Sequence, residues 1–220
     1  MNCVFQISDT HSDLWLMPLD NLHITTMEVA HSVTAAEIDH LVTVLQPHCQ
    51  EIADFPTTHR ARLIKPLLNY DSAALALSFV PAAGESLPHG RTEDDDKYSY
   101  HHLRRDLFAA ITETGLPIAS RYVVPSAHLT VARFNSPNVF GGDPMDGGVA
   151  LDIKKRRHWI SEIETINKWL QAEYWPQEGE SIMPGGEWVV GEEKGLDFRR
   201  GTLWYGDGES VYVGKGFTYG

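Results

Sequence analysis

Two short apolar segments, one in each half of the chain, carry a His-x-Thr pattern at their centres. They read Leu22-His23-Ile24-Thr25 and Ala127-His128-Leu129-Thr130. With 11 histidines in 220 residues, chance gives roughly 1.4 His-x-Ser/Thr matches, but roughly 0.24 when apolar residues must flank the histidine. Two His-x-Thr motifs with apolar flanks therefore predict two strands that carry the same arrangement of side chains.

The alternation of side chains along a strand decides where these groups point. Residues two apart share a face, so each motif presents its imidazole and its hydroxyl together, and the residue between them enters the opposite side. If the two strands adjoin, two histidines and two threonines converge. Histidine serves as acid or base because its unperturbed pKa is near neutrality, and threonine hydroxyls can hold phosphoryl oxygens. The alternative is a pair of core histidines in strands that threonine favours.

The rest of the chain predicts an α+β fold. Helices are expected over about 35–53, over about 97–114 and after Asp152. The first begins with the capping-box pattern Thr34-Ala35-Ala36-Glu37. The apolar stripe expected of the third consists of Trp159, Ile163, Ile166, Trp169 and Leu170. Strands are expected at 4–7, 14–17, 22–29, 73–80, 122–124, 127–134, 187–190, 202–205 and 210–213, with a turn at 207–208 joining the last two. Loops at 81–90, 135–148 and 177–186 leave no long linker, which favours two closely packed lobes.

Composition limits the class of function. A net charge of −12 and a pI near 5.3 argue against a protein that coats long nucleic acid, and leave a small or terminal phosphodiester open. Two cysteines, Cys3 and Cys49, are too few for a disulfide scaffold or a cysteine zinc site. No stretch is long enough to cross a bilayer and the N-terminus lacks a secretory pattern. We expect an intracellular monomer, cytoplasmic or nuclear.

The two motif regions together resemble a known family. The segment 14–25, Leu-Trp-Leu-Met-Pro-Leu-Asp-Asn-Leu-His-Ile-Thr, resembles the first-motif region of the 2H phosphoesterase superfamily. The segment 128–134, His-Leu-Thr-Val-Ala-Arg-Phe, is similar to the second motif of bacterial RNA 2',3'-cyclic phosphodiesterases, often called 2'-5' RNA ligase-like. Thr26 stands where that family usually has a hydrophobic residue, and the motifs do not explain the tail 177–220.

The resemblance implies one bilobal domain over 1–220, with a pseudo-twofold axis and a central cleft. It implies a metal-independent phosphodiesterase without cofactor. Thr25 and Thr130 would bind the phosphate. By analogy with members that form 2'-phosphates, His128 is the base and His23 the acid; members that form 3'-phosphates reverse these roles.

Three further residues are candidates for substrate contact. Arg133 faces away from His128 on a regular strand, but the resemblance places an arginine here in the phosphate site; the alternative is a surface ion pair. Trp15 and Tyr122 offer aromatic faces for a nucleotide base, and core packing is the alternative for both.

Other charged or histidine clusters predict no site. The acidic run 93–96 lacks the ligand spacing of a calcium loop and is expected to be a solvated loop before a helix. His101 and His102 are adjacent on a predicted helix and so do not share a face, and solvent exposure is expected. The basic cluster 154–157 would be spread around a helix.

The sequence thus predicts hydrolysis of a 2',3'-cyclic phosphate on a nucleotide or RNA end. The alternatives are ADP-ribose 1'',2''-cyclic phosphate, linear 2'-5' or 3'-5' oligonucleotides, and a non-catalytic nucleotide-binding module.

Overall fold

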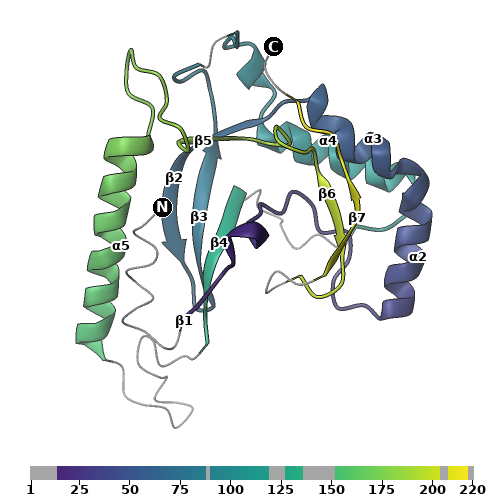
Figure 1. Cartoon of the computed structure of the whole chain (residues 1–220), viewed down its shortest axis with the longest axis horizontal. Helices are drawn as coiled ribbons and strands as arrows, with labels where there is room; N and C mark the ends of the chain where they lie inside the picture. Colours follow the sequence, from purple (N-terminus) through teal and green to yellow (C-terminus); the bar gives the residue numbers. More distant parts are fainter. Residues whose placement is uncertain (1–13, 88–89, 119–126, 136–151, 204–207, 218–220) are drawn as a thin grey trace.

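The structure is a computed structural model that describes residues 14–87, 90–118, 127–135, 152–203 and 208–217. The predicted strands at 4–7 and 122–124, and with them Tyr122, lie outside these residues. The described chain forms a curved antiparallel sheet flanked by helices, which confirms the α+β class (Figure 1).

The main sheet has five antiparallel strands in the order β1-β4-β3-β2-β5. These are β1 (Leu14–Leu16), β2 (Arg62–Tyr70), β3 (Ala74–Pro81), β4 (Ala127–Phe134) and β5 (Glu187–Val189). A separate hairpin pairs β6 (Asp197–Arg200) with β7 (Glu209–Val213). The second motif thus lies inside the main sheet, on β4.

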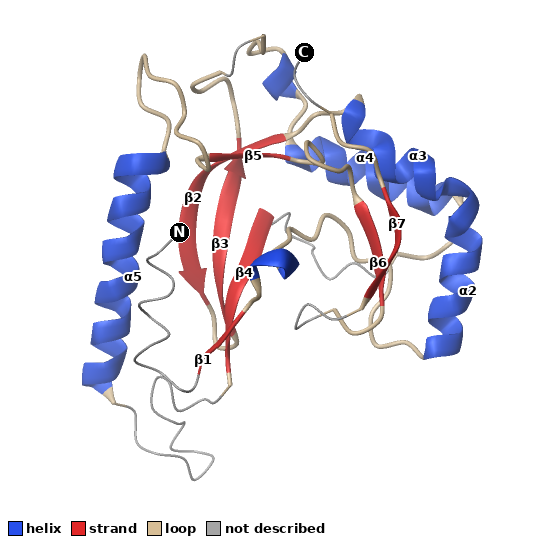
Figure 2. Cartoon of the chain, in the orientation of Figure 1, coloured by secondary structure: helices blue, strands red, loops and turns tan. Residues whose placement is uncertain are grey.

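The helices gather in two places (Figure 2). They are α2 (Ala35–Leu45), α3 (Cys49–Asp54), α4 (Tyr100–Glu113) and α5 (Ile153–Tyr174), with short 3-10 turns η1 (Leu19–Asn21), η2 (Gln46–His48), η3 (Phe55–Thr57) and η4 (Asp95–Lys97). In the view of Figure 1, α5 is drawn to the left of the main sheet, and α2, α3 and α4 are drawn with the β6–β7 hairpin to the right. Both groups pack on the same face of the curved sheet, because Leu75 on β3 belongs to the core under α5 and Phe79, on the same face of β3, belongs to the core of α3 and α4. No helix among the described residues is long and apolar enough to cross a bilayer.

Helix α5 matches its prediction, with one exception. Asp152 caps it by accepting hydrogen bonds from the amides of Lys154 and Lys155. Trp159, Ile163 and Leu170 are buried in a core with Leu68, Leu75 and Ala132 of the sheet. The expectation for Trp169 was wrong: this ring is 37% exposed and contacts Tyr174 at the helix end.

The predicted helix over 35–53 is interrupted. The capping box of Thr34 and Glu37 is present as expected, with Thr34 N donating to Glu37 at 2.7 Å. Pro47 has no amide hydrogen to continue the ladder, and the chain passes through η2 before α3 begins at Cys49. Buried residues of α3 and α4 form the second core with Leu63 and Phe79 of the sheet.

Three strand predictions need correction. Strand β2 was missed because Arg62, Lys65 and Pro66 interrupt its apolar pattern. The 22–29 strand is reduced to one bridge residue, Ile24. The strand that pairs with β7 is β6 at 197–200, whereas the sequence predicted it at 202–205. Residues 204–205 lie outside the described part of the chain.

Candidate active site

The two His-x-Thr motifs lie side by side. Ile24 and Leu129, the middle residues of the motifs, are antiparallel bridge partners. In this register His23 stands opposite Thr130, and Thr25 opposite His128. Directly opposite residues share a face with Cβ atoms about 5 Å apart, and diagonal neighbours such as the two histidines are about 7 to 8 Å apart. The bridge therefore places all four groups on one face.

The residues between them point the other way. Ile24 packs against the core of α3 and α4, and Leu129 is buried. The four polar residues are all half-buried, so their side chains keep contact with solvent. Alternation along the strands thus separates an apolar anchor from a polar face, as the sequence predicts.

A register shift in β4 changes the position of Arg133. Leu75 pairs with Ala132, but the next residue, Ala76, pairs with Thr130, so Val131 is an extra residue that forms a bulge. Arg133 then pairs with Ala74, which shares a face of β3 with Ala76. The bulge thus brings Arg133 to the face of Thr130, whereas on a regular strand it would face away.

Trp15 belongs to the same face. It pairs with Arg133 across β1 and β4, and its neighbours Leu14 and Leu16 pair with Phe134 and Ala132. Leu14 and Leu16 pack against the core under α5, which turns Trp15 to the opposite side. The polar face therefore carries an aromatic ring beside a guanidinium group, next to the paired motifs.

The threonine hydroxyls of the motifs differ from most other threonine hydroxyls in the described part of the chain. Thr43 and Thr112, for example, donate to the carbonyl four residues earlier on their helices. Within the described residues, the hydroxyls of Thr25 and Thr130 make no hydrogen bond. Two hydroxyls on one face are thus available to a ligand.

A tight turn sets the orientation of His23. Residues 18–22 form a 3-10 turn in which Asn21 N donates to Pro18 O at 2.9 Å. The turn presents the carbonyl of Asn21 to Nδ1 of His23 at 2.7 Å. Because a carbonyl oxygen only accepts, Nδ1 of His23 carries the hydrogen and donates this bond.

Helix α4 holds the backbone that follows the first motif. The hydroxyl of Tyr100 donates to Thr25 O at 3.3 Å, and Nε of Arg104 donates to Thr26 O at 2.9 Å. Both side chains are buried. The sequence indicated the helix but gave no sign of these contacts, because they join residues far apart in the chain.

The acidic run 93–96 is more than a solvated loop. Asp96 is buried and accepts hydrogen bonds from Arg62 at 2.6 Å and from Arg91 at 2.9 Å. Burial by itself raises the pKa of Asp96, but hydrogen bonds from Arg62, the Gly84 amide and Arg91 outweigh it, and the pKa lies below its usual value. This network ties β2 to the loop before α4.

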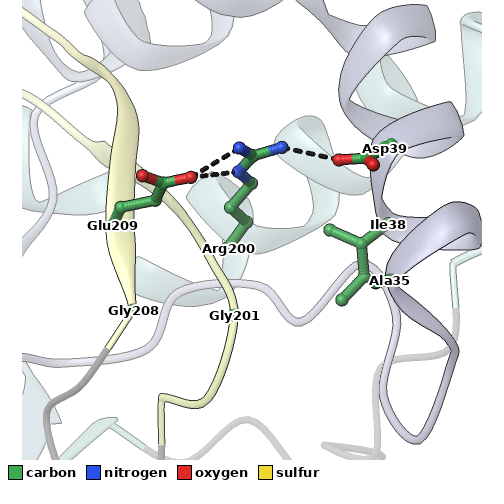
Figure 3. Close-up of a pocket in the computed structure, with 7 residues that line it drawn as sticks. All are labelled: Ala35, Ile38, Asp39, Arg200, Gly201, Gly208 and Glu209. Atoms are coloured by element: carbon green, nitrogen blue, oxygen red, sulfur yellow. Dashed lines mark hydrogen bonds and ion pairs between the residues drawn. The ribbon is translucent and has the colours of Figure 1, made fainter.

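A surface pocket of about 430 Å³ lies elsewhere, between α2 and the β6–β7 hairpin (Figure 3). Arg200 crosses it and bonds Asp39 at 2.7 Å and Glu209 at 2.6 Å. The other lining residues are Ala35, Ile38, Gly201 and Gly208. None of the residues predicted from the motifs lines it, and its one cation is already paired with two carboxylates.

Of the adjacent histidines His101 and His102, only the second has a structural role. His101 is exposed, whereas His102 is half-buried and its Nδ1 accepts a hydrogen bond from Ser99 N at 3.1 Å, which caps α4. Among the described residues, no group of three His, Cys, Asp or Glu side chains is arranged to hold a metal ion.

Comparison with protein-family models, with curated protein sequences and with solved structures found no match to this chain.

Proposed function

We propose that the protein is a metal-independent phosphodiesterase that opens a 2',3'-cyclic phosphate on a nucleotide or an RNA end. The observation that carries the proposal is the Ile24–Leu129 bridge, because it joins two motifs that are far apart in sequence. A pair of core histidines would need no such partnership. The four residues are half-buried, and the hydroxyls of Thr25 and Thr130 make no hydrogen bond to any described residue, which supports the same interpretation.

The chemistry follows from the placement of the four groups. A phosphate between the two imidazoles would receive hydrogen bonds from Thr25 and Thr130. Water attacks phosphorus and gives its proton to His128, while the bond from phosphorus to the ribose 3' oxygen breaks. His23 gives its Nε2 proton to that oxygen, and the product is a 2'-phosphate. Formation of a 3'-phosphate would exchange the two roles.

The pseudo-twofold symmetry of the proposed bilobal domain has a local counterpart. Two antiparallel paired strands have a local twofold axis that passes between the paired residues, perpendicular to the sheet. Around the Ile24–Leu129 bridge this axis exchanges His23 with His128 and Thr25 with Thr130. We propose that this local axis is the axis of a domain spanning 1–220, with a central cleft between its two lobes.

The neighbours of the motifs fit a nucleotide. The bulge turns Arg133 to the polar face, where it would bind the phosphate, and the ring of Trp15 beside it would stack on the base. We extend the same role to Tyr122. The net charge of −12 favours a small substrate over long RNA. We place the activity in a monomer inside the cell, in the cytoplasm or nucleus.

Phosphorus NMR of the purified protein with adenosine 2',3'-cyclic phosphate and EDTA tests the proposal. Conversion to the 2'-phosphate by wild type, and not by a His23→Ala/His128→Ala double variant, is expected. A 3'-phosphate would keep the reaction and reverse the roles. Absence of conversion would reject this substrate, and ADP-ribose 1'',2''-cyclic phosphate and 2'-5' or 3'-5' dinucleotides are then assayed in the same way. If none is turned over, the non-catalytic nucleotide-binding module is the reading that stands.

A further inference from the structure

We infer that Tyr100 and Arg104 on α4 are positioning residues that hold the first motif in register with the second. The inference rests on the proposed function, since it concerns the same four groups. It assigns to α4 a task in catalysis beyond its part in the core.

The first motif needs such support because its own strand pairing is minimal. Ile24 forms a single bridge, and the following residues 25–30 have no strand structure. On β4, by contrast, the second motif pairs continuously with β3 from Ala127 to Thr130. One motif is therefore fixed by a ladder of hydrogen bonds and the other is not.

The side chains of α4 take the place of that ladder. Tyr100 donates to Thr25 O at 3.3 Å and Arg104 donates to Thr26 O at 2.9 Å. The two residues are four positions apart and share one helix face. Two consecutive carbonyls are thus held by one rigid element.

Burial makes these donors stiff. Tyr100 is 0% exposed and Arg104 is 7% exposed, and Tyr100 belongs to the same core as Leu103 and Leu107. A side chain that is closely packed on all sides is restricted to one rotamer. The two donors therefore restrict the positions of the Thr25 and Thr26 carbonyls. The Thr25 hydroxyl and the His23 ring are attached to this stretch of backbone.

The contact with α4 does not depend on which side chain stands at position 26. Its carbonyl, and not its side chain, is used by Arg104. Misplacement of a catalytic group by about 1 Å costs on the order of 100-fold in rate. Loss of either donor should therefore slow the chemical step.

Steady-state kinetics of three variants with adenosine 2',3'-cyclic phosphate test the inference. Tyr100→Phe removes only a hydroxyl, Arg104→Leu removes the donor, and Arg105→Gln is the matched control, because Arg105 is exposed on the same helix and bonds only Asp106 among the described residues. We expect kcat to fall about 10- to 100-fold in the first two variants, with a smaller change in KM. Arg104→Lys, which keeps a donor, should recover part of the loss. An unchanged kcat in both Tyr100→Phe and Arg104→Leu would overturn the inference. A fall in kcat that is fully explained by an equal fall in the fraction of folded protein would overturn it as well.

NMR separates failure of this inference from failure of the proposed function. In ¹⁵N-histidine-labelled protein, Arg104→Leu should shift the signal of His23 and leave that of His158 on α5 unchanged. This readout needs no turnover, so it decides the positioning role even if the wild type is inactive on the cyclic phosphate. An unchanged His23 signal would contradict the inference.

Discussion

Ile24 and Leu129 are antiparallel bridge partners, and each is the middle residue of a His-x-Thr motif. This relationship places His23 beside Thr130 and Thr25 beside His128 on one face of the sheet. The proposed activity requires that register. A shift of one residue would turn one motif to the opposite face.

The two histidines should be essential for turnover. His23→Ala and His128→Ala are each expected to lower kcat by about 10²- to 10⁴-fold, because each removes a proton-transfer group. His158→Ala on the exposed face of α5 serves as the control. Turnover of the cyclic phosphate and thermal unfolding are measured together. Wild-type turnover in both site variants would refute the enzyme proposal.

The pH dependence of turnover should be bell-shaped. The base must be deprotonated and the acid protonated, so each histidine produces one limb. In the residual activity, His128→Ala should lose the acidic limb and His23→Ala the alkaline limb. The profiles are recorded with and without EDTA. Strong inhibition by the chelator would count against the metal-independent mechanism.

Arg133 should contribute to substrate binding. The bulge at Val131 places it on the polar face, and a charge-assisted hydrogen bond to phosphate is worth about 1.5 to 3 kcal/mol. Arg133→Ala is therefore expected to lower kcat/KM about 10- to 100-fold. Arg105→Ala, at an exposed site, is the control. Equal kcat/KM in the two variants would place Arg133 outside the phosphate site.

Asp96 should matter for stability and not for chemistry. Asp96→Asn removes the carboxylate charge that is shared by the buried guanidinium groups of Arg62 and Arg91, although Arg62 keeps its ion pair with Glu187, and the expected cost is about 3 kcal/mol. Asp94→Asn is the matched control, since Asp94 is exposed and pairs only with Lys97 among the described side chains. Urea unfolding at neutral pH measures both.

The pH dependence of that stability has a definite sign. The pKa of Asp96 is lower in the folded chain than its usual value. Its stabilisation is therefore present above the unfolded pKa of about 3.9 and is lost as pH falls through the folded pKa. The difference in unfolding free energy between wild type and Asp96→Asn should shrink on acidification. A constant difference would contradict the assignment.

The sequence predicted the elements that depend on residues close together in the chain. The capping box at Thr34, the start of α5 after Asp152 and the whole of β4 are where the sequence predicts them. Each depends on side chains within a few residues of one another. The pairing of the two motifs was expected only on the condition that their strands adjoin.

Features that depend on distant partners were missed. Strand β2 contains Arg62, which is tolerated inside because Asp96 and Glu187 neutralise it from far along the chain. The bulge that reorients Arg133 arises from the register with β3, which no single strand reveals. The contacts of Tyr100 and Arg104 with the first motif have the same origin.

The most direct test of the central claim is whether one phosphate contacts both motifs. Protein labelled with ¹⁵N-histidine is titrated with adenosine 2'-phosphate, the proposed product, and the imidazole signals are assigned with the His23→Ala and His128→Ala variants. We predict that the signals of His23 and His128 shift together with a single midpoint, while that of His158 does not move. Shifts with different midpoints, or a shift of only one of the two, would show that the motifs do not form one site.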